Sequence, residues 1–241
     1  MKEKNITKHL RLPFKFEEKA LLKDLEKAQQ NSWGAHYVTS GYEGEWKILA
    51  LHAPHGDPTN IFANHSENEL GIKETPVIKD CHYFKKVIAS FQCDFQAVRL
   101  MKLGVGAYIK PHTDHNLGYD DGCFRLHIPI TTNQDVEFLL DGKRLIMNPG
   151  ECWYTNVNYT HSVANRGKTE RVHLVIDGLR NEWSDQVFFS AAPKESFFPE
   201  KEDFSAETMR QIIESLKFMD SPKAKELIAS YETKLAELKD G

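Results

Sequence analysis

The sequence predicts a mainly β protein with flanking α-helices, in which the strands form an antiparallel sandwich or jelly roll. Between Phe95 and about Gly178, apolar residues alternate as they do in short strands, and turn residues separate each run from the next. On both sides of this block, apolar residues recur at helical spacing instead. Many short strands at close intervals are typical of sandwiches and jelly rolls.

Two amphipathic helices are predicted before the strand block. One runs from Phe16 to Gln30 and ends before a run of residues that favours a turn. The other covers about Cys81 to Phe91. The residues on their apolar faces are Leu21, Leu22, Leu25 and Ala28 in the first helix, and Phe84, Val87, Ile88 and Phe91 in the second.

The strand block opens with Phe95–Leu103 and continues through shorter runs. Turn-forming pairs and triplets such as Asp141-Gly142 and Asn148-Pro149-Gly150 lie between them. The shorter strands are predicted at Phe124–Thr131, Val136–Leu140, Lys143–Met147, Glu151–Tyr154, Thr160–Ala164 and Arg171–Asp177.

The pattern becomes helical again after Gly178. A helix is predicted over Ala206–Phe218, and a second starts at Ser221-Pro222, with a serine at the N-cap and a proline at the first helical position. We expect these helices to form a hairpin that packs against the barrel or between the subunits of a homodimer. The chain is accordingly divided into residues 1–180, the β-rich domain with its N-terminal helices, and residues 181–241, a helical extension.

The composition is that of an ordinary soluble protein of 241 residues, 40% hydrophobic and 27% charged. A net charge of −4 favours neither a nucleic-acid nor a membrane partner. No apolar run approaches the ~20 residues needed to cross a bilayer, and the charged N-terminus does not resemble a signal peptide. The four cysteines lie far apart, without a Cys-x-x-Cys pair, which predicts reduced thiols in a cytoplasmic protein.

The candidate chemistry lies in His112-Thr113-Asp114 and in His161, which follows 47 residues after Asp114. Residues i and i+2 of a strand project from the same face, so His112 and Asp114 can reach one ion while Thr113 points away. Two imidazoles and one carboxylate form the ligand set that holds non-haem Fe(II) and leaves one face of the ion open. We therefore predict an iron site formed by His112, Asp114 and His161.

His115 offers an alternative, because His112-x-x-His115 is also a spacing that binds metal. On a strand His115 would point away from the pair, so we expect it at the rim of the site. The function that corresponds to this alternative is a zinc hydrolase using His112, His115 and His161 with a metal-bound water.

Arg171 follows ten residues after His161, on the next predicted strand. A guanidinium pairs with both oxygens of a carboxylate, so Arg171 is predicted to clamp a carboxylate cosubstrate beside the metal. An oxygenase combines these two features, the iron site and the arginine that binds a carboxylate cosubstrate. A metal-binding module without catalysis has no need for such an arginine.

Arg125 and His127 share one face of an otherwise apolar strand and therefore need partners, because an unpaired buried charge is costly. Either a bound carboxylate or an internal acidic residue such as Glu151 would satisfy Arg125. Arg171 and His173 repeat the same spacing, and we expect His173 to be a core histidine rather than a ligand.

These motifs resemble the aspartyl/asparaginyl β-hydroxylase family of Fe(II)- and 2-oxoglutarate-dependent oxygenases. Within that family, the layout is most similar to the small bacterial free-proline hydroxylases. The resemblance covers about Phe95 to Asp177, roughly a third of the chain. Its segments are Ile109–Asp114, Arg125–Ile130, Pro149–Trp153, His161–Asn165 and Arg171–Asp177.

The resemblance implies a double-stranded β-helix with Fe(II) held by His112, Asp114 and His161. Arg171 would bind the distal carboxylate of 2-oxoglutarate, and Arg125 and His127 would lie at the cosubstrate's other end or at the substrate. It further implies a small-molecule substrate, a free amino acid of proline-like kind, which is hydroxylated with O2 as the oxidant. The alternatives are a hydroxylase of aspartyl or asparaginyl residues in a peptide or protein, and a non-catalytic cupin-like metal-binding module.

Trp46 also matches a position at which family members place a tryptophan near the mouth of the pocket. Its alternative role is that of a core aromatic residue which anchors an N-terminal strand.

Overall fold

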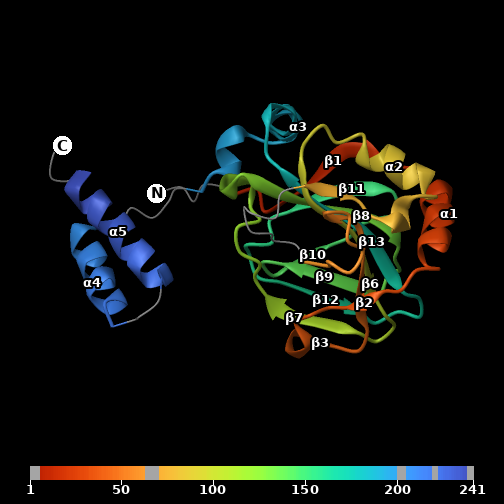
Figure 1. The fold of residues 1–241 in the computed structure, drawn as a ribbon, viewed down its shortest axis with the longest axis horizontal. Helices are drawn as coiled ribbons and strands as arrows, with labels where there is room; N and C mark the ends of the chain where they lie inside the picture. The colour runs from red at the N-terminus through yellow and green to blue at the C-terminus, as the bar shows by residue number, and fades with distance from the viewer. Residues whose placement is uncertain (1–5, 63–70, 200–204, 219–221, 238–241) are drawn as a thin grey trace. The chain divides into compact units, whose positions relative to one another are not determined.

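The computed structural model describes residues 6–62, 71–199, 205–218 and 222–237 (Figure 1). The chain divides into two compact units, Met1–Pro199 and Glu200–Gly241. The first unit contains two antiparallel sheets that lie one above the other, with helices on the outer side of the larger sheet (Figure 1). This is the predicted jelly roll. The predicted boundary between independent domains at 180/181 stays a prediction.

The larger sheet has eight strands in the order β1-β11-β8-β13-β6-β4-β2, with β5 beside β4. Neighbouring strands are antiparallel throughout. The strands are β1 (His9–Lys15), β2 (Gly34–Ala35), β4 (Trp46–Pro54), β5 (Ile72–Glu74), β6 (Phe95–Leu103), β8 (Cys123–Thr131), β11 (Glu151–Thr155) and β13 (Arg171–Leu179).

The smaller sheet has five strands in the order β10-β9-β12-β7-β3. They are β3 (Tyr42–Glu43), β7 (Tyr108–His112), β9 (Val136–Leu140), β10 (Lys143–Leu145) and β12 (His161–Asn165). Each strand predicted after Phe95 is present, and β10 ends at Leu145 rather than at Met147. β4 lacks the alternation that marks a half-exposed strand, because most of its residues are buried on both faces of the sheet.

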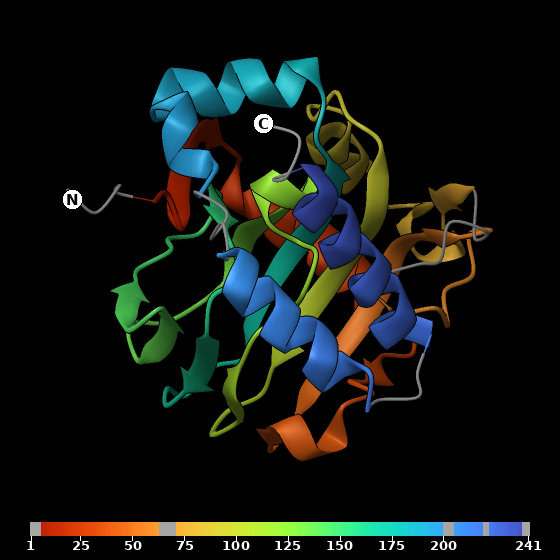
Figure 2. The same cartoon turned by 90° about the vertical axis from the view of Figure 1, so that its left-hand side faces the viewer.

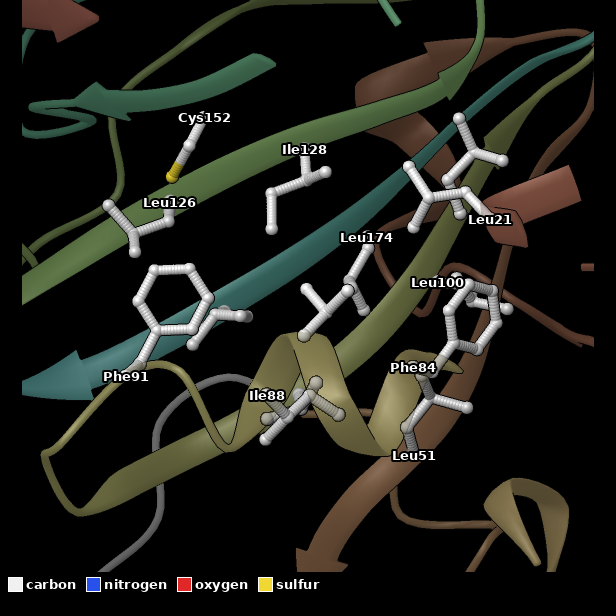
Figure 3. Close-up of a cluster of buried hydrophobic side chains, with 14 of the residues drawn as sticks. Leu21, Leu51, Phe84, Ile88, Phe91, Leu100, Leu126, Ile128, Cys152 and Leu174 are labelled. Atoms are coloured by element: carbon white, nitrogen blue, oxygen red, sulfur yellow. The ribbon is translucent and has the colours of Figure 1, made fainter. Parts of the chain in front are cut away.

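Alternation along the strands of the larger sheet creates two separate cores. In β6, β8 and β13, even-numbered residues such as Leu126 and Leu174 point toward helices α1 (Glu18–Ala28) and α2 (His82–Ile88), as Figure 3 shows. Odd-numbered residues such as Met101 and Val175 point toward the smaller sheet. The odd-numbered arginines and histidines of β6, β8 and β13 therefore face the space between the sheets, where the candidate site lies.

Two short helices follow β13. Helix α3 (Glu182–Ala191) lies beside β1 (Figure 2), where Trp183 and Phe14 bring their ring centroids to 6.3 Å. The 3-10 helix η4 (Lys194–Phe197) then adds Phe197 to the outer core. Of the other 3-10 helices, η1 (Thr39–Gly41) precedes β3, η2 (Pro76–Ile78) lies between β5 and α2, and η3 (Tyr119–Asp121) lies between β7 and β8.

The second unit is the predicted helical hairpin. Helix α4 (Ala206–Leu216) packs on α5 (Pro222–Glu237) through buried Met209, Ile213 and Ala224. The predicted N-cap Ser221 and the predicted stripe residue Leu238 lie outside the described residues.

The four cysteines are free thiols, as the sequence predicts, and three of them are buried. Among the described helices, none combines the length and the apolar character that crossing a bilayer requires.

Candidate active site

The three predicted metal ligands lie together at the smaller sheet. His112 ends β7, and His161 begins β12 directly opposite it, because the two residues are partners in the antiparallel register. Asp114 follows two residues after β7, where its backbone N–H donates to the Val157 carbonyl at 2.9 Å. One ligand atom from each of the three residues lies within 4.8 Å of the others. The predicted set is thus brought together, although a loop rather than the strand holds Asp114.

The two histidines present the same nitrogen to the centre of this cluster. The Nδ1–H of His112 donates to the Lys110 carbonyl at 2.8 Å, and that of His161 donates to the Tyr159 carbonyl at 3.0 Å. Each Nε2 therefore keeps its lone pair for a metal, which is how metal-binding histidines are usually oriented. His115 is exposed and lies outside the cluster, and its place at the rim of the site stays a prediction.

A buried chain of charges connects Asp114 with the larger sheet. Arg125 on β8 donates from Nη1 to Asp114 Oδ2 at 2.5 Å and from Nε to Asp177 Oδ1 at 2.6 Å. Arg99 on β6 donates to the other oxygen of Asp177. Burial by itself would raise the pKa of the Asp114 carboxyl, but Arg125, together with His161 and His112, outweighs burial, and the pKa lies below its ordinary value. Asp114 is therefore an ionised carboxylate whose Oδ1 remains available beside His112.

The internal partner proposed for Arg125 on sequence grounds was the wrong residue. Arg125 is paired internally, but with Asp177 and Asp114 rather than with Glu151. Thr155 of β11 lies opposite Arg125 in the register, and Glu151 lies four residues further along that strand, about 13 Å away. Glu151 instead accepts hydrogen bonds from Arg11 and from the Trp153 indole.

A cavity of about 140 Å³ lies beside the three ligands. Among the described residues, six buried side-chain polar atoms have no hydrogen-bond partner, and four of them belong to side chains that line this cavity. Buried polar groups are normally satisfied, so a group of unsatisfied nitrogens around one cavity indicates a ligand rich in oxygen acceptors. The four atoms are Trp46 Nε1, Arg99 Nε, His127 Nε2 and Arg171 Nε.

Arg171 begins β13 and lines the same cavity. It is buried, its Nη2 lies 2.8 Å from His173 Nδ1, and no carboxylate of the described residues pairs with it. Burial lowers its pKa to about 9. A buried guanidinium without an anionic partner is costly, so a bound carboxylate in the cavity would stabilise it strongly.

Trp46 is a core aromatic residue, which is the alternative role given for it from the sequence, and its place near the mouth of the pocket stays a prediction. It is only 7% exposed and begins β4, and it also lines the cavity. His36 stacks on its indole, with ring centroids 3.5 Å apart and planes 5° from parallel.

Sequence reasoning gave no role to Arg99, Asp177 or His36, although all three are buried at the site. The signal available for Arg99 was the one used for Arg125, a charged residue inside an apolar strand. Asp177 lies directly opposite Arg125 in the β8–β13 register. That pairing depends on which strands are neighbours, so only the folded chain reveals it.

The buried histidines make stability depend on pH. Burial lowers the pKa of His36 and His161 to about 4, and that of His127 and His173 well below its ordinary value. Below about pH 6.5 the unfolded chain binds protons at these residues while the folded chain does not. We expect the free energy of unfolding to be highest above pH 6.5 and to fall toward pH 4, by up to about 1.4 kcal/mol per pH unit for each histidine.

Urea unfolding of the metal-free protein at pH 7.5 and pH 5.0 measures this effect. Equal free energies of unfolding at the two pH values would contradict the assignment of these histidines as neutral in the folded state.

Comparison with known proteins identifies the family. Residues 15–181 match the family model described as aspartyl/asparaginyl β-hydroxylase. The chain belongs to the aspartyl/asparaginyl β-hydroxylase family. The matched region contains every side chain of the site described above, which confirms the resemblance seen in the motifs.

The sequence identities between this chain and individual relatives are low. The chain is 29% identical over 166 residues to an L-proline cis-4-hydroxylase of Rhizobium meliloti (strain 1021), a match that covers 68% of this chain and 58% of that protein. A prolyl-4-hydroxylase structure from Pseudomonas putida is 12% identical, with a TM-score of 0.43, over 72% of this chain and 94% of that one. A structure of an oxidoreductase of the 2OG-Fe(II) oxygenase family from Burkholderia pseudomallei is 16% identical, with a TM-score of 0.41. The match covers 66% of this chain and 79% of that one.

Proposed function

We propose that the protein is an Fe(II)- and 2-oxoglutarate-dependent dioxygenase that hydroxylates an unactivated C–H bond of a free amino acid, proline-like or similarly small and carboxylate-bearing. Membership of the β-hydroxylase family supports this proposal, as does the likeness to a protein described as an L-proline cis-4-hydroxylase. The observation that carries it is Arg171, a buried cation without an anionic partner among the described residues, in the same cavity as His112, Asp114 and His161.

The donor set fits iron. Two imidazoles and one carboxylate lie together in the lining of the cavity and would leave one face of a bound ion open to other ligands. His112, Asp114 and His161 would hold the ion, while the hydrogen bond from Arg125 to Asp114 Oδ2 leaves Oδ1 for coordination. Bound iron with 2-oxoglutarate and O2 supplies the oxidant, with succinate and CO2 as the by-products of hydroxylation.

The remaining residues would bind and orient the two organic molecules. Arg171 would pair with the distal carboxylate of 2-oxoglutarate through its forked N–H groups. His127, whose Nε2 is buried without a partner, would donate to another cosubstrate oxygen. Arg125 is already paired with two carboxylates, so its contribution would be to hold Asp114 in place.

Charge balance favours a substrate with a carboxylate. Arg99, Arg125 and Arg171 line the cavity, and Asp114 and Asp177 are the carboxylates that pair with this group. A divalent metal and a dianionic cosubstrate would cancel each other, so one positive charge remains for a substrate anion. Arg99 has a free buried Nε for it.

The proposal is tested by adding Fe(II) and 2-oxoglutarate to the protein without oxygen. We expect the weak visible charge-transfer absorption of a chelated 2-oxo acid, and a Zn(II)-loaded sample as control should lack it. Folded, iron-loaded protein without this absorption would contradict the oxygenase assignment and favour the metal-binding module. Succinate production across free amino acids, and across peptides containing Asp or Asn, would then separate the free-amino-acid substrate from the peptide alternative.

Two further proposals concern the whole chain. Free thiols support a cytoplasmic location. Phe218, which is 91% exposed at the end of the α4 segment, supports a homodimer through the C-terminal helices, since a second copy could cover it. Sedimentation of the full chain and of Phe218→Asp tests the dimer, which the substitution should dissociate.

A further inference from the structure

Apolar side chains are exposed at the rim of the cavity. Tyr37 is 52% exposed and Val38 is 43% exposed, and both line the cavity. Phe62 is 46% exposed and packs on Tyr37, with ring centroids 4.9 Å apart. The other large exposed apolar side chains of the described residues belong to separate elements. Two exposed apolar side chains that line a cavity, with a third packed on one of them, are a feature of ligand-binding surfaces.

The rim is continuous with the wall of the cavity. The His36 ring lies between the Trp46 indole and Tyr37, with centroids at 3.5 and 4.5 Å, and Tyr42 meets the indole edge-on. Since Phe62 continues this series beyond Tyr37, aromatic rings run from the buried Trp46 to the surface.

Hydrogen bonds fix the two segments of the rim to the sheet. The His36 N–H donates to the Trp46 carbonyl at 2.9 Å, and the Val38 N–H to His36 Nδ1 at 3.3 Å. On the other side, Arg99 donates to the Ile61 carbonyl at 3.3 Å, next to Phe62. The apolar surface is therefore held in position beside the arginine that faces the cavity.

The cavity thus has a charged interior and an apolar mouth. The arginines and His161 are buried, while Tyr37 and Val38 are exposed at the entrance and Phe62 packs on Tyr37. A molecule whose carboxylate is held inside can remove the rim from water only if it carries an apolar group that reaches outward. Proline has no such second group.

We propose that the substrate is an amino acid larger than proline, with a bulky apolar side chain that lies against Tyr37, Val38 and Phe62. This inference rests on the proposed function, because it places the substrate in the same cavity, and it replaces the proline-like amino acid of that proposal with a larger one. It assigns the selection of the side chain to the rim and the binding of the carboxylate to the interior.

The experiment compares L-proline with L-leucine, L-phenylalanine and L-tryptophan. Binding to the Fe(II)- and 2-oxoglutarate-loaded protein is measured by calorimetry without oxygen, and succinate production is measured with oxygen. We expect at least one of the bulky amino acids to bind about tenfold or more tightly than proline, and to stimulate succinate production more strongly.

Variants of the exposed rim residues localise the effect. Tyr37→Ala and Phe62→Ala are each expected to weaken binding of the bulky amino acid about fivefold or more, because an aromatic contact is lost. Proline binding and the affinity for 2-oxoglutarate should change less than twofold. Val105→Ala is the matched control, since Val105 is 57% exposed but does not line the cavity.

Three outcomes would overturn the inference: proline binding as tightly as every bulky amino acid, rim variants that leave the bulky ligand unaffected, or rim variants that weaken proline equally. Each is distinct from failure of the proposed function, which would appear as no 2-oxoglutarate binding by the unaltered protein. In that event, calorimetry of the same amino acids on the metal-free protein and its rim variants decides the inference by itself.

Discussion

The variant His161→Ala is expected to lose metal binding while keeping its fold. The imidazole of His161 is held by one backbone hydrogen bond, and its Nε2 has no other function in the described structure than to face His112 and Asp114. Loss of an outer hydrogen bond at a metal site typically weakens affinity 10–100-fold, so loss of a ligand itself should exceed about 100-fold. Titration with Fe(II) or Co(II) without oxygen measures the affinity, and circular dichroism verifies the fold.

The matched control for this variant is His115→Ala. His115 lies three residues after His112 but is exposed and outside the cluster, so its removal should leave metal affinity within about twofold. If His115→Ala lost the metal and His161→Ala retained it, the assigned ligand set would be wrong. The zinc hydrolase alternative, which needs both histidines, predicts that the two variants fail together.

The variant Arg171→Met is expected to bind 2-oxoglutarate much more weakly without loss of stability. Truncating one partner of a buried charge pair typically costs 2–5 kcal/mol, which corresponds to a loss of roughly 30-fold or more in affinity. Methionine keeps a flexible apolar chain beside Phe138, whose ring lies 5.8 Å from the Arg171 guanidinium carbon. Because the ligand-free protein buries this cation without an anion, its removal should leave the urea midpoint unchanged or raise it.

Two companion variants complete the test of Arg171. Arg171→Lys should recover part of the lost affinity, since it restores the charge but not the two-pronged geometry. Arg166→Ala removes an exposed guanidinium elsewhere and should bind 2-oxoglutarate normally. Calorimetry on the Fe(II)-loaded variants measures each affinity. An Arg171→Met variant with normal affinity would assign the cosubstrate carboxylate to another residue.

The sequence was most informative where local pattern and chemistry coincide. Alternation of apolar residues located the strands after Phe95, because side chains in a strand point to opposite faces and one face is buried. The spacing of His112 and Asp114, with His161 and Arg171 at the end of the block, predicted the cluster that the fold brings together. The extent of β4 was not predicted, although an N-terminal strand at Trp46 was one interpretation, because a strand buried on both faces carries no alternation.

The charge network shows where pattern alone is insufficient. The sequence indicated that Arg125 needs a partner, and it offered both Glu151 and a bound carboxylate. Which acid lies opposite Arg125 depends on the neighbour and the register of its strand, and the structure selects Asp177. The same long-range pairing places Arg99 beside Asp177.

By itself, the sequence of this protein determined the jelly-roll class, the family and the residues with metal-ligand chemistry. The class follows from local periodicity, the candidate ligands from residue types and their places in the strand pattern, and the family from the resemblance of these motifs to those of known members. Only the tertiary structure decided how His112 meets His161, how Arg125 holds Asp114, and which side chains form the apolar rim. The physical reason is that these contacts join residues far apart in the chain, and antiparallel register, rather than spacing along the sequence, fixes their distances.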